Sequence, residues 1–329
     1  MRIVITGATG FIGAALTRRL LADGHNVTAL ARAGADHWRL MDAAVRWISA
    51  DILLPATLDN AFVGADWIIH AAGKLGAAGV PEAAYHRLHV EGTRHVLRAV
   101  QQQTPQSRVL YVGSLGVVGP VADPLRTGWP DESAPLAPTN AYERSKARAE
   151  DAALEFNRQG LDVVLARPEF VYGPDDTHVL GLFRAIQRRL FFYIGDGANW
   201  CHPTYIDDCV TGLVACLTHG RRGAIYHLAG PRPVTWREFA GTAAETLGVR
   251  PPRLRIPYAA AWAGAWAAEW LGARFQRQPP LSRSGVAFFH ENRGGSWAKA
   301  RAEIGYAPQI PLAEGFARTL TAYRRRGWL

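Results

Sequence analysis

The amino-acid sequence predicts an α/β fold, in which a doubly wound parallel sheet is followed by a smaller lobe. Over about the first 170 residues, short apolar runs alternate with helical patterns, which is typical of a parallel sheet covered by helices. A glycine-rich turn, residues 6–13, joins the first apolar run to the first helical pattern. The 329 residues suffice for one large domain and a lobe, and the pattern becomes irregular after residue 174.

The glycine-rich turn indicates a dinucleotide-binding site. It follows a buried strand expected over residues 3–5 and opens a helix. Gly7 suits the tight turn, Gly10 lets the backbone approach a pyrophosphate, and Gly13 lets the helix pack closely on the strand. The helix N-terminus offers free N–H groups and a positive dipole end to the phosphates. The turn therefore predicts a Rossmann-type cofactor site rather than a purely structural turn.

The second strand, expected over residues 25–31, ends at the residue that distinguishes the two nicotinamide cofactors. An acidic side chain here accepts hydrogen bonds from the ribose of NAD, whereas an arginine pairs with the 2′-phosphate of NADP. This sequence has Arg32, with no acid before Asp36. It favours NADP(H), while NAD(H) stays possible because an exposed arginine is often merely solvated.

The third and fourth strands are expected over residues 45–49 and 66–70. Asp51 follows the third, and its carboxylate either bonds an adenine amine or caps a turn; the sequence leaves both readings open. The fourth strand leads into Ala71, Ala72 and Gly73, which are small enough to let the backbone approach the cofactor. His70, at its end, is expected to be a packed histidine.

The next helix is expected over residues 82–103, and a fifth strand over 108–112 ends at Gly113 and Ser114. A helix then carries Tyr142 and Lys146 one turn apart. The ammonium group is expected to stabilise a phenolate and so lower the tyrosine pKa, which makes Tyr142 a usable acid or base. Ser114 is expected to hydrogen-bond a substrate oxygen beside it.

The later elements are expected to return to the sheet. A sixth strand is expected over 161–166, and residues 202–206 and 224–229, with a helix over 207–218 between them, are the expected returns. We therefore predict a dinucleotide-binding domain over 1–174 with returns at about 200–230. The substrate-binding lobe comprises 175–199 and 231–315, and 316–329 is the end of a C-terminal helix.

Composition and charge limit the partners. The net charge of +9 favours anions such as cofactor phosphates or an acidic substrate. No nucleic-acid-binding motif accompanies this charge, so nucleic acid is not an expected partner. The three cysteines lack C-x-x-C spacing, which predicts a reducing compartment and no cysteine-based metal site. The N-terminus reads as a strand rather than a signal peptide, so we expect a cytoplasmic protein without a bound metal.

Several motifs, in their order and approximate spacing, resemble the extended short-chain dehydrogenase/reductase family, also known as the NAD-dependent epimerase/dehydratase family. They are residues 6–13, 70–73, Ser114, Tyr142 with Lys146, 167–174, 202–208 and 226–230. The resemblance implies hydride transfer between a nicotinamide and a carbon that bears an alcohol or ketone. In this family Tyr142 would donate or accept the proton, Lys146 would bind the nicotinamide ribose and Ser114 would orient the reacting oxygen.

The resemblance also completes the predicted cofactor site. It implies that Pro168 and Val171 line the nicotinamide pocket and that Asp51 and Ile52 flank the adenine. The full set of predicted cofactor-binding residues is Gly7, Thr9, Gly10, Phe11, Ile12, Gly13, Arg32, Asp51, Ile52, Ala71, Ala72, Gly73, Tyr142, Lys146, Pro168 and Val171.

One position departs from the family pattern. The family usually has an asparagine before the V-x-G-T step, where it supports a water-linked proton path, and this sequence has His89. A histidine both donates and accepts hydrogen bonds, so a relay through His89 is one interpretation.

The C-terminal part indicates the substrate class. The segments 279–283 and 299–306 resemble the branch of 3β-hydroxysteroid dehydrogenases and dihydroflavonol reductases. Members of that branch act on bulky apolar alcohols and ketones. A stripe at helical spacing, Tyr258, Trp262, Trp266 and Trp270, is expected to pack in the core; a ligand wall or a membrane-surface contact is a lesser interpretation.

Three functions follow from these observations. The first is an NAD(P)-dependent oxidoreductase of a bulky, largely apolar secondary alcohol or ketone. The second is a nucleotide-sugar epimerase with tightly bound NAD, whose diphosphate would need arginines such as Arg184, Arg188, Arg189, Arg232 and Arg237. The third is a non-catalytic NAD(P)-sensing protein. A homodimer through helices 82–103 and 140–158 is expected from the family.

Overall fold

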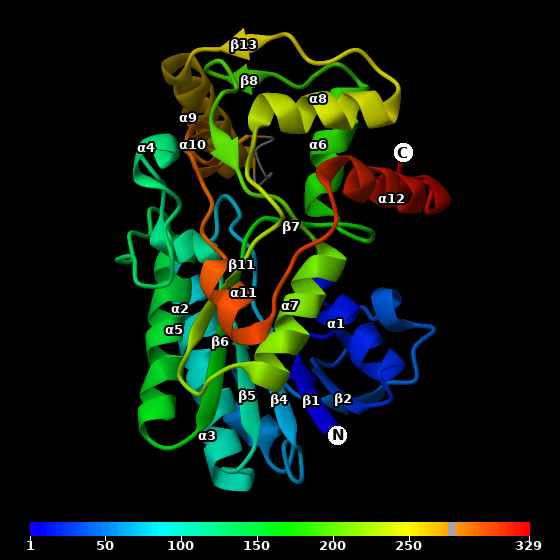
Figure 1. Ribbon diagram of the computed structural model, residues 1–329, viewed down its shortest axis with the longest axis vertical. Coiled ribbons are helices and arrows are strands. Elements are labelled where there is room, and N and C mark those ends of the chain that lie inside the picture. The colour runs from blue at the N-terminus through cyan, green and yellow to red at the C-terminus, as the bar shows by residue number, and fades with distance from the viewer. Residues whose placement is uncertain (276–280) are drawn as a thin grey trace.

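The computed structural model describes residues 1–275 and 281–329, and its centre is a seven-stranded parallel sheet (Figure 1). The strand order is β11-β6-β5-β4-β1-β2-β3. This order reverses direction beside β1, which is the arrangement of dinucleotide-binding sheets. The strands are β1 (Arg2–Thr6), β2 (Asn26–Ala31), β3 (Arg46–Ser49), β4 (Trp67–His70), β5 (Arg108–Val112), β6 (Asp162–Pro168) and β11 (Ile225–Leu228).

Helices cover both faces of this sheet, because its central strands are apolar on both sides. In β1, Ile3 and Ile5 belong to one buried cluster and Val4 to the other. The first cluster includes side chains of α1 (Phe11–Ala22) and α7 (Ile206–His219). The second includes side chains of α3 (Gly92–Gln103) and α5 (Ala141–Arg158). The predicted doubly wound α/β fold is therefore confirmed.

The helical segment predicted over residues 82–103 contains an irregular turn. It consists of α2 (Glu82–His86), a π-helical turn (Arg87–Glu91) and α3. Single π-helical turns often occur at functional sites, since they change the direction of side chains on a helix. Here the turn contains His89, which is buried.

One of the predicted returns to the central sheet is wrong. Within residues 202–206, β10 (Thr204–Tyr205) pairs with β7 (Val171–Tyr172) in a separate two-stranded ladder. Only β11 joins the central sheet, beside β6. The partner strand β7 follows β6 beyond the carboxyl end of the central sheet, so the pair of β7 and β10 lies outside that sheet.

The remaining elements lie above the carboxyl ends of the central strands (Figure 1). Two further ladders occur there, one between β8 (Tyr193–Ile194) and β13 (Arg255–Ile256) and one between β9 (Trp200–Cys201) and β12 (Val234–Thr235). The C-terminal helix begins at residue 312, before the predicted segment 316–329. No helix of the described ranges has the length and hydropathy of a membrane span. The helices above the sheet are α4 (Pro124–Thr127), α6 (His178–Gln187), α8 (Trp236–Leu247), α9 (Tyr258–Phe275), α10 (Arg283–His290) and α12 (Leu312–Arg325). Helix α11 (Ala298–Ile304) lies against α7 and β11.

The tryptophan stripe of α9 is not in the core, contrary to the prediction. Trp262, Trp266 and Trp270 are 38%, 57% and 63% exposed. Ala261 and Ala265 form the buried face instead, in a small cluster with residues of β8 and α10. Alanine lets the helix approach these neighbours closely, so the indoles lie on the flank that faces solvent. The resembling segment 279–283 lies partly outside the described residues.

Candidate active site

The glycine-rich turn has the close backbone contacts that the sequence predicts. Gly7 has φ +77°, and a Cβ atom at Gly7 would lie 2.5 Å from the carbonyl oxygen of Ala71. A Cβ atom at Gly13 would lie 2.1 Å from the carbonyl oxygen of Gly7. The Gly10 amide donates to the same oxygen at 3.0 Å. Side chains at Gly7 and Gly13 are therefore excluded by backbone atoms, which brings β1, α1 and the end of β4 together.

The N-terminus of α1 suits a diphosphate. Gly10 is the N-cap residue, no side chain caps the helix, and its first turn has no acidic residue. The first amides of a helix have no intrahelical acceptor, so those of Phe11, Ile12 and Gly13 are available to an anion. Thr9 lies in the same turn, and its carbonyl oxygen accepts from Arg39 Nη1 at 3.3 Å.

The ends of β2 and β3 lie side by side, with Arg32 after β2 and Asp51 after β3. Arg32 is exposed, and its guanidinium group forms no hydrogen bond or ion pair with the described part of the chain. Asp36 Oδ1 accepts from the amide of Trp38 at 3.0 Å, so this acid caps a turn. Asp51 Oδ1 likewise accepts from the amide of Leu53 at 2.9 Å, which is the turn-capping contact.

The end of β4 is held by a buried histidine. His70 Nδ1 lies 2.7 Å from Thr6 Oγ1, and its Nε2 lies 3.0 Å from Thr93 Oγ1. Burial lowers the pKa of His70 to about 3, so the ring is neutral and packs as predicted. It fixes the strand from which Ala71, Ala72 and Gly73 continue past the glycine-rich turn. Ile52 is buried, and its Cδ1 would lie 2.7 Å from a Cβ atom at Gly92.

The structure brings Ser114, Tyr142 and Lys146 together at the carboxyl end of β5. Ser114 lies two residues after the end of β5 and caps the 3-10 helix Leu115–Val118. The amide of Gly116 donates to the Oγ atom of Ser114 at 3.3 Å. Tyr142 and Lys146 lie on the first turns of α5. Lys146 Nζ donates to the carbonyl oxygen of Val112, the last residue of β5, at 2.8 Å.

The first turn of α5 is held in place by its own polar residues. Asn140 Oδ1 accepts from the amide of Glu143 at 3.0 Å and caps the helix. Glu143 Oε2 accepts from the amide and hydroxyl of Thr139, at 2.8 and 2.9 Å. Its Oε1 pairs with Arg293 Nη1 at 2.6 Å in a buried ion pair. Tyr142 therefore lies between Asn140, which caps the first turn of α5, and Glu143, which ties this turn to Thr139 and Arg293.

Burial changes the pKa of both the phenol and the ammonium group. It raises the pKa of Tyr142 to about 12, against the opposing effect of the nearby Ser114 hydroxyl. It lowers the pKa of Lys146 to about 8. Burial is therefore the larger effect on the pKa of the phenol in this structure, and the lowering of that pKa by Lys146 stays a prediction. The Tyr142 hydroxyl is therefore protonated at neutral pH.

His89 contacts the same site, but both of its ring nitrogens are already used. Nε2 accepts from the amide of Lys74 at 3.0 Å, and Nδ1 lies 2.7 Å from Ser145 Oγ. Ser145 Oγ in turn donates to the carbonyl oxygen of Tyr142 at 2.6 Å. The His89 and Tyr142 rings meet edge to face, with centroids 5.7 Å apart. His89 thus bridges the loop after β4 and the backbone of Tyr142.

Pro168 and Val171 flank two residues that the sequence analysis missed. Glu169 is buried, burial raises its pKa to about 7, and its charge acts on Tyr142. Phe170 has φ +29°, a conformation rare for a side chain of this size. Its ring packs against Trp236, Phe239 and Phe288, with centroid distances of 5.6–5.7 Å. The segment 167–174 gave no local signal for this carboxyl group or strain.

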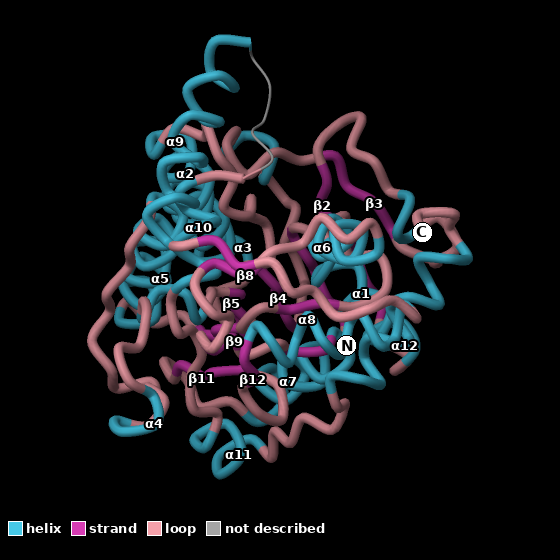
Figure 2. The backbone as a smooth tube through the Cα atoms, turned by 90° about the horizontal axis from the view of Figure 1, so that it is seen from above, coloured by secondary structure: helices cyan, strands magenta, loops and turns pink. Residues whose placement is uncertain are grey.

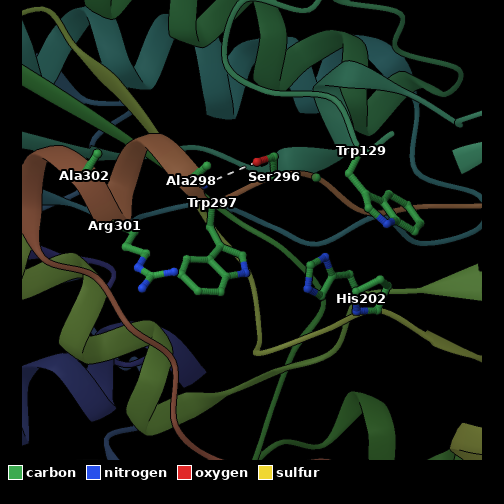
Figure 3. A pocket seen from close by; sticks show the side chains of 9 residues that line it. Trp129, His202, Ser296, Trp297, Ala298, Arg301 and Ala302 are labelled. Atoms are coloured by element: carbon green, nitrogen blue, oxygen red, sulfur yellow. Dashed lines mark hydrogen bonds between the residues drawn. The ribbon is translucent and has the colours of Figure 1, made fainter. Parts of the chain in front are cut away.

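Two cavities lie near these elements. One, of about 520 Å³, is lined by residues of α1 from Phe11 to Arg19, by Arg39 and by the first residues of α7. The other, of about 620 Å³, lies beside α11 and is lined by Trp129, His202, Trp297 and Arg301 (Figure 3). Ser114, Tyr142 and Lys146 do not line the second cavity, so it is separate from the predicted reacting groups.

Comparison with known proteins agrees with this geometry. The model of the NAD dependent epimerase/dehydratase family matches residues 3–229. The chain is 31% identical over 332 residues to the 4-hydroxy-2-methyl-3-oxo-4-farnesyl-3,4-dihydroquinoline-1-oxide ketoreductase of Stigmatella aurantiaca, covering 99% of this chain and 97% of that protein. It is 27% identical over 337 residues to a putative dihydroflavonol 4-reductase of Synechocystis sp., covering 99% and 95%.

A solved structure is similar along the whole chain. The crystal structure of the dTDP-glucose 4,6-dehydratase DesIV from Streptomyces venezuelae, with NAD and TYD bound, has 27% sequence identity and a TM-score of 0.80. The match covers 100% of this chain and 98% of that one. The resemblance predicted from the motifs is confirmed: the chain belongs to the NAD-dependent epimerase/dehydratase family and is an NAD(P)-dependent oxidoreductase.

Proposed function

We propose that the protein interconverts a bulky, largely apolar ketone and its secondary alcohol, with NADP(H) as the preferred cofactor and Tyr142 as the acid or base. The observation that carries this proposal is the position of Ser114, Tyr142 and Lys146 at the end of β5. The glycine-rich turn after β1 lies at the same edge of the sheet, where ligands of such folds bind.

The residues of the chain have distinct roles in this reaction. The nicotinamide, when bound, supplies or accepts the hydride. Tyr142, protonated at neutral pH because its pKa is raised to about 12, donates its proton to the carbonyl oxygen as the alcohol forms. Ser114 orients that oxygen by a hydrogen bond. Lys146 holds the cofactor ribose and supplies positive charge beside the phenol, which stabilises the phenolate left after transfer.

Arg32 supports NADP(H) as the preferred cofactor. Its side chain is exposed at the end of β2 and has no partner in the described part of the chain. The next acid in the sequence, Asp36, is engaged with the amide of Trp38. A guanidinium group at this place pairs with a 2′-phosphate, which NAD lacks.

The substrate class rests on the lobe and on the relatives. Three of the arginines that an epimerase would use for a diphosphate are engaged elsewhere: Arg184 donates to Trp328, Arg232 pairs with Glu238 and Arg237 donates to Asp196. By contrast, Phe170, Trp236 and Phe288 form an aromatic cluster next to the segment that contains Pro168 and Val171. Two relatives are named as reductases, one of a farnesyl-substituted 3-oxo compound and one of dihydroflavonol. These observations favour an apolar ketone.

The test is NADPH oxidation by the purified protein with a panel of aryl, isoprenoid and steroid ketones. Tyr142→Phe should lower kcat by about 10²- to 10⁴-fold, as for the loss of a general acid. NADPH binding, followed by cofactor fluorescence, should change less than about twofold, because the ring itself is kept. As a control, Tyr258→Phe on α9 should keep full activity.

Two results would support the alternatives. Copurifying NAD with tight binding of a nucleotide-sugar, and no net oxidation of NADPH, would favour the epimerase. Cofactor binding without turnover of any ketone or nucleotide-sugar, by wild type and Tyr142→Phe alike, would favour a sensing protein.

A further inference from the structure

The most unusual surface of the described chain is the outer flank of α9. Trp262, Trp266 and Trp270 recur every four residues along one side of this helix, and all three are exposed. Leu271 and Phe275 follow them and are 48% and 64% exposed. Figure 2 shows the C-terminal half of α9 projecting away from the other elements. Exposed aromatic residues in such a row indicate a contact with another apolar phase or molecule.

The flank combines these rings with positive charge. Between residues 250 and 290 the sequence has six arginines and one acidic residue, Glu269. Glu269 is paired with Arg283, whose Nε lies 2.7 Å from its Oε2. Arg253 and Arg255 before the helix, and Arg274 near its end, are exposed and form no ion pair within the described ranges. Uncompensated cations therefore lie at both ends of the row of indoles.

We propose that this flank of α9 docks the protein on an anionic lipid bilayer surface. Tryptophan is enriched at the level of lipid headgroups, where its ring is in the apolar boundary and its N–H remains hydrated. Exposed arginines add attraction to a negatively charged leaflet. The alanines and glycines between the indoles let the helix lie close to the headgroups. The helix lies on the surface, since no described helix is suited to cross a bilayer.

Charge favours the bilayer over a second copy of the chain. In a symmetric dimer the same patch faces itself, so the arginines of one copy would approach those of the other. An anionic surface compensates these charges instead. The docking also positions the elements above the sheet, which include α9 and α10, towards the phase in which apolar molecules dissolve.

The experiment is cosedimentation of the full chain with vesicles of phosphatidylcholine, with and without phosphatidylglycerol. The wild type should bind the phosphatidylglycerol vesicles, and binding should fall as salt rises. The double variant Trp266→Ser, Trp270→Ser should lower the partition coefficient at least about tenfold, because two interfacial rings are lost. Arg253→Gln with Arg255→Gln should remove the preference for phosphatidylglycerol.

The matched control is Leu125→Ser, which removes an apolar side chain that is 80% exposed on α4 and should leave binding unchanged. Circular dichroism and the thermal midpoint check that each variant is folded. Equal binding of wild type and the tryptophan variant, or no binding of the wild type to either vesicle, would overturn the proposal. Conversion of a dimer to a monomer by the tryptophan variant, without vesicle binding by wild type, would instead identify the flank as an interface between copies.

Discussion

His89 Nδ1 lies 2.7 Å from Ser145 Oγ, a hydroxyl that also donates to the carbonyl oxygen of Tyr142. The histidine, on a π-helical turn, thus fixes the backbone of the proton donor through one intervening hydroxyl. Its other nitrogen holds the loop after β4 through the Lys74 amide. Because both nitrogens are occupied, we expect His89 to act by positioning rather than by proton transfer.

Replacing this histidine should lower kcat while leaving the pH profile unchanged. His89→Ala leaves the Lys74 amide and the Ser145 hydroxyl without their partner, so we expect a loss in kcat of about tenfold, since about 1.4 kcal/mol corresponds to one hydrogen bond. His89→Asn can replace one of these contacts and should recover part of the rate. Steady-state kinetics well below the thermal midpoint distinguish this from a loss of folding. Two results would contradict the positioning role. One is an unchanged kcat in His89→Ala; the other is an ionisation in the pH profile of the wild type that is absent from the profile of His89→Ala.

Arg32→Ala should change the choice between cofactors. Loss of a charge-assisted pair with the 2′-phosphate should raise KM for NADPH about tenfold or more and leave KM for NADH nearly unchanged. Arg46→Ala, an exposed arginine on the neighbouring strand β3, is the matched control. Equal effects of Arg32→Ala on both cofactors would show that Arg32 does not read the 2′-phosphate.

Folding stability should fall steeply in mild acid because of four buried histidines. Burial lowers the pKa of His70, His89 and His227 to about 3 and that of His202 to about 4. In the unfolded chain these rings titrate near pH 6.5, so below that pH the unfolded state binds more protons. The free energy of unfolding then decreases as the pH falls from about 6.5 towards 4, by up to about 1.4 kcal/mol per pH unit for each ring.

Denaturant titrations between pH 7 and pH 5 measure this dependence. His227→Asn should reduce proton uptake on unfolding by about one, whereas His219→Asn, at an exposed position, should leave it unchanged. A free energy of unfolding that stays constant over this range would rule out neutral buried histidines.

Gly13→Ala should damage the cofactor turn. The new Cβ atom would lie 2.1 Å from the carbonyl oxygen of Gly7, a backbone atom that cannot move without moving β1. We expect a loss of at least about 2 kcal/mol in the free energy of unfolding, together with weaker NADPH binding. Gly181→Ala, on α6 with no atom within 4 Å of the added carbon, should be neutral or stabilising by up to about 1 kcal/mol. Similar losses in both variants would mean that the close approach of Gly13 is not the cause.

Local patterns were sufficient for the sheet and for the order of its motifs. Strands such as β1 are apolar on both faces, and turns such as that at Gly7 need residues without a Cβ atom, so both leave clear marks in sequence. A histidine in place of asparagine at position 89 was equally visible. Its partners were not, because Lys74 and Ser145 lie on other elements and their contact depends on the packing of α5 against the loop.

The wrong predictions concerned sequence patterns that occur both in the core and at the surface, or in more than one sheet. A row of aromatic residues at helical spacing defines a face but not what it meets, and on α9 the small residues Ala261 and Ala265 form the buried side. A short β-prone segment at residues 202–206 likewise gave no indication of its partner strand. Arg293 was missed because its partner, Glu143, is 150 residues away in sequence.

That ion pair links the segment after α10 to the first turn of α5. Arg293 follows α10, while Glu143 is the immediate neighbour of Tyr142. Arg293 also donates to Thr139 Oγ1 and Glu291 Oε2. Its guanidinium group thus connects the segment after α10 to the first turn of α5 and to the loop before it. A rigid rotation of α10 against the sheet would pull on the turn that carries the phenol. We therefore expect that a substrate which moves α10 on binding would also move the backbone of Tyr142.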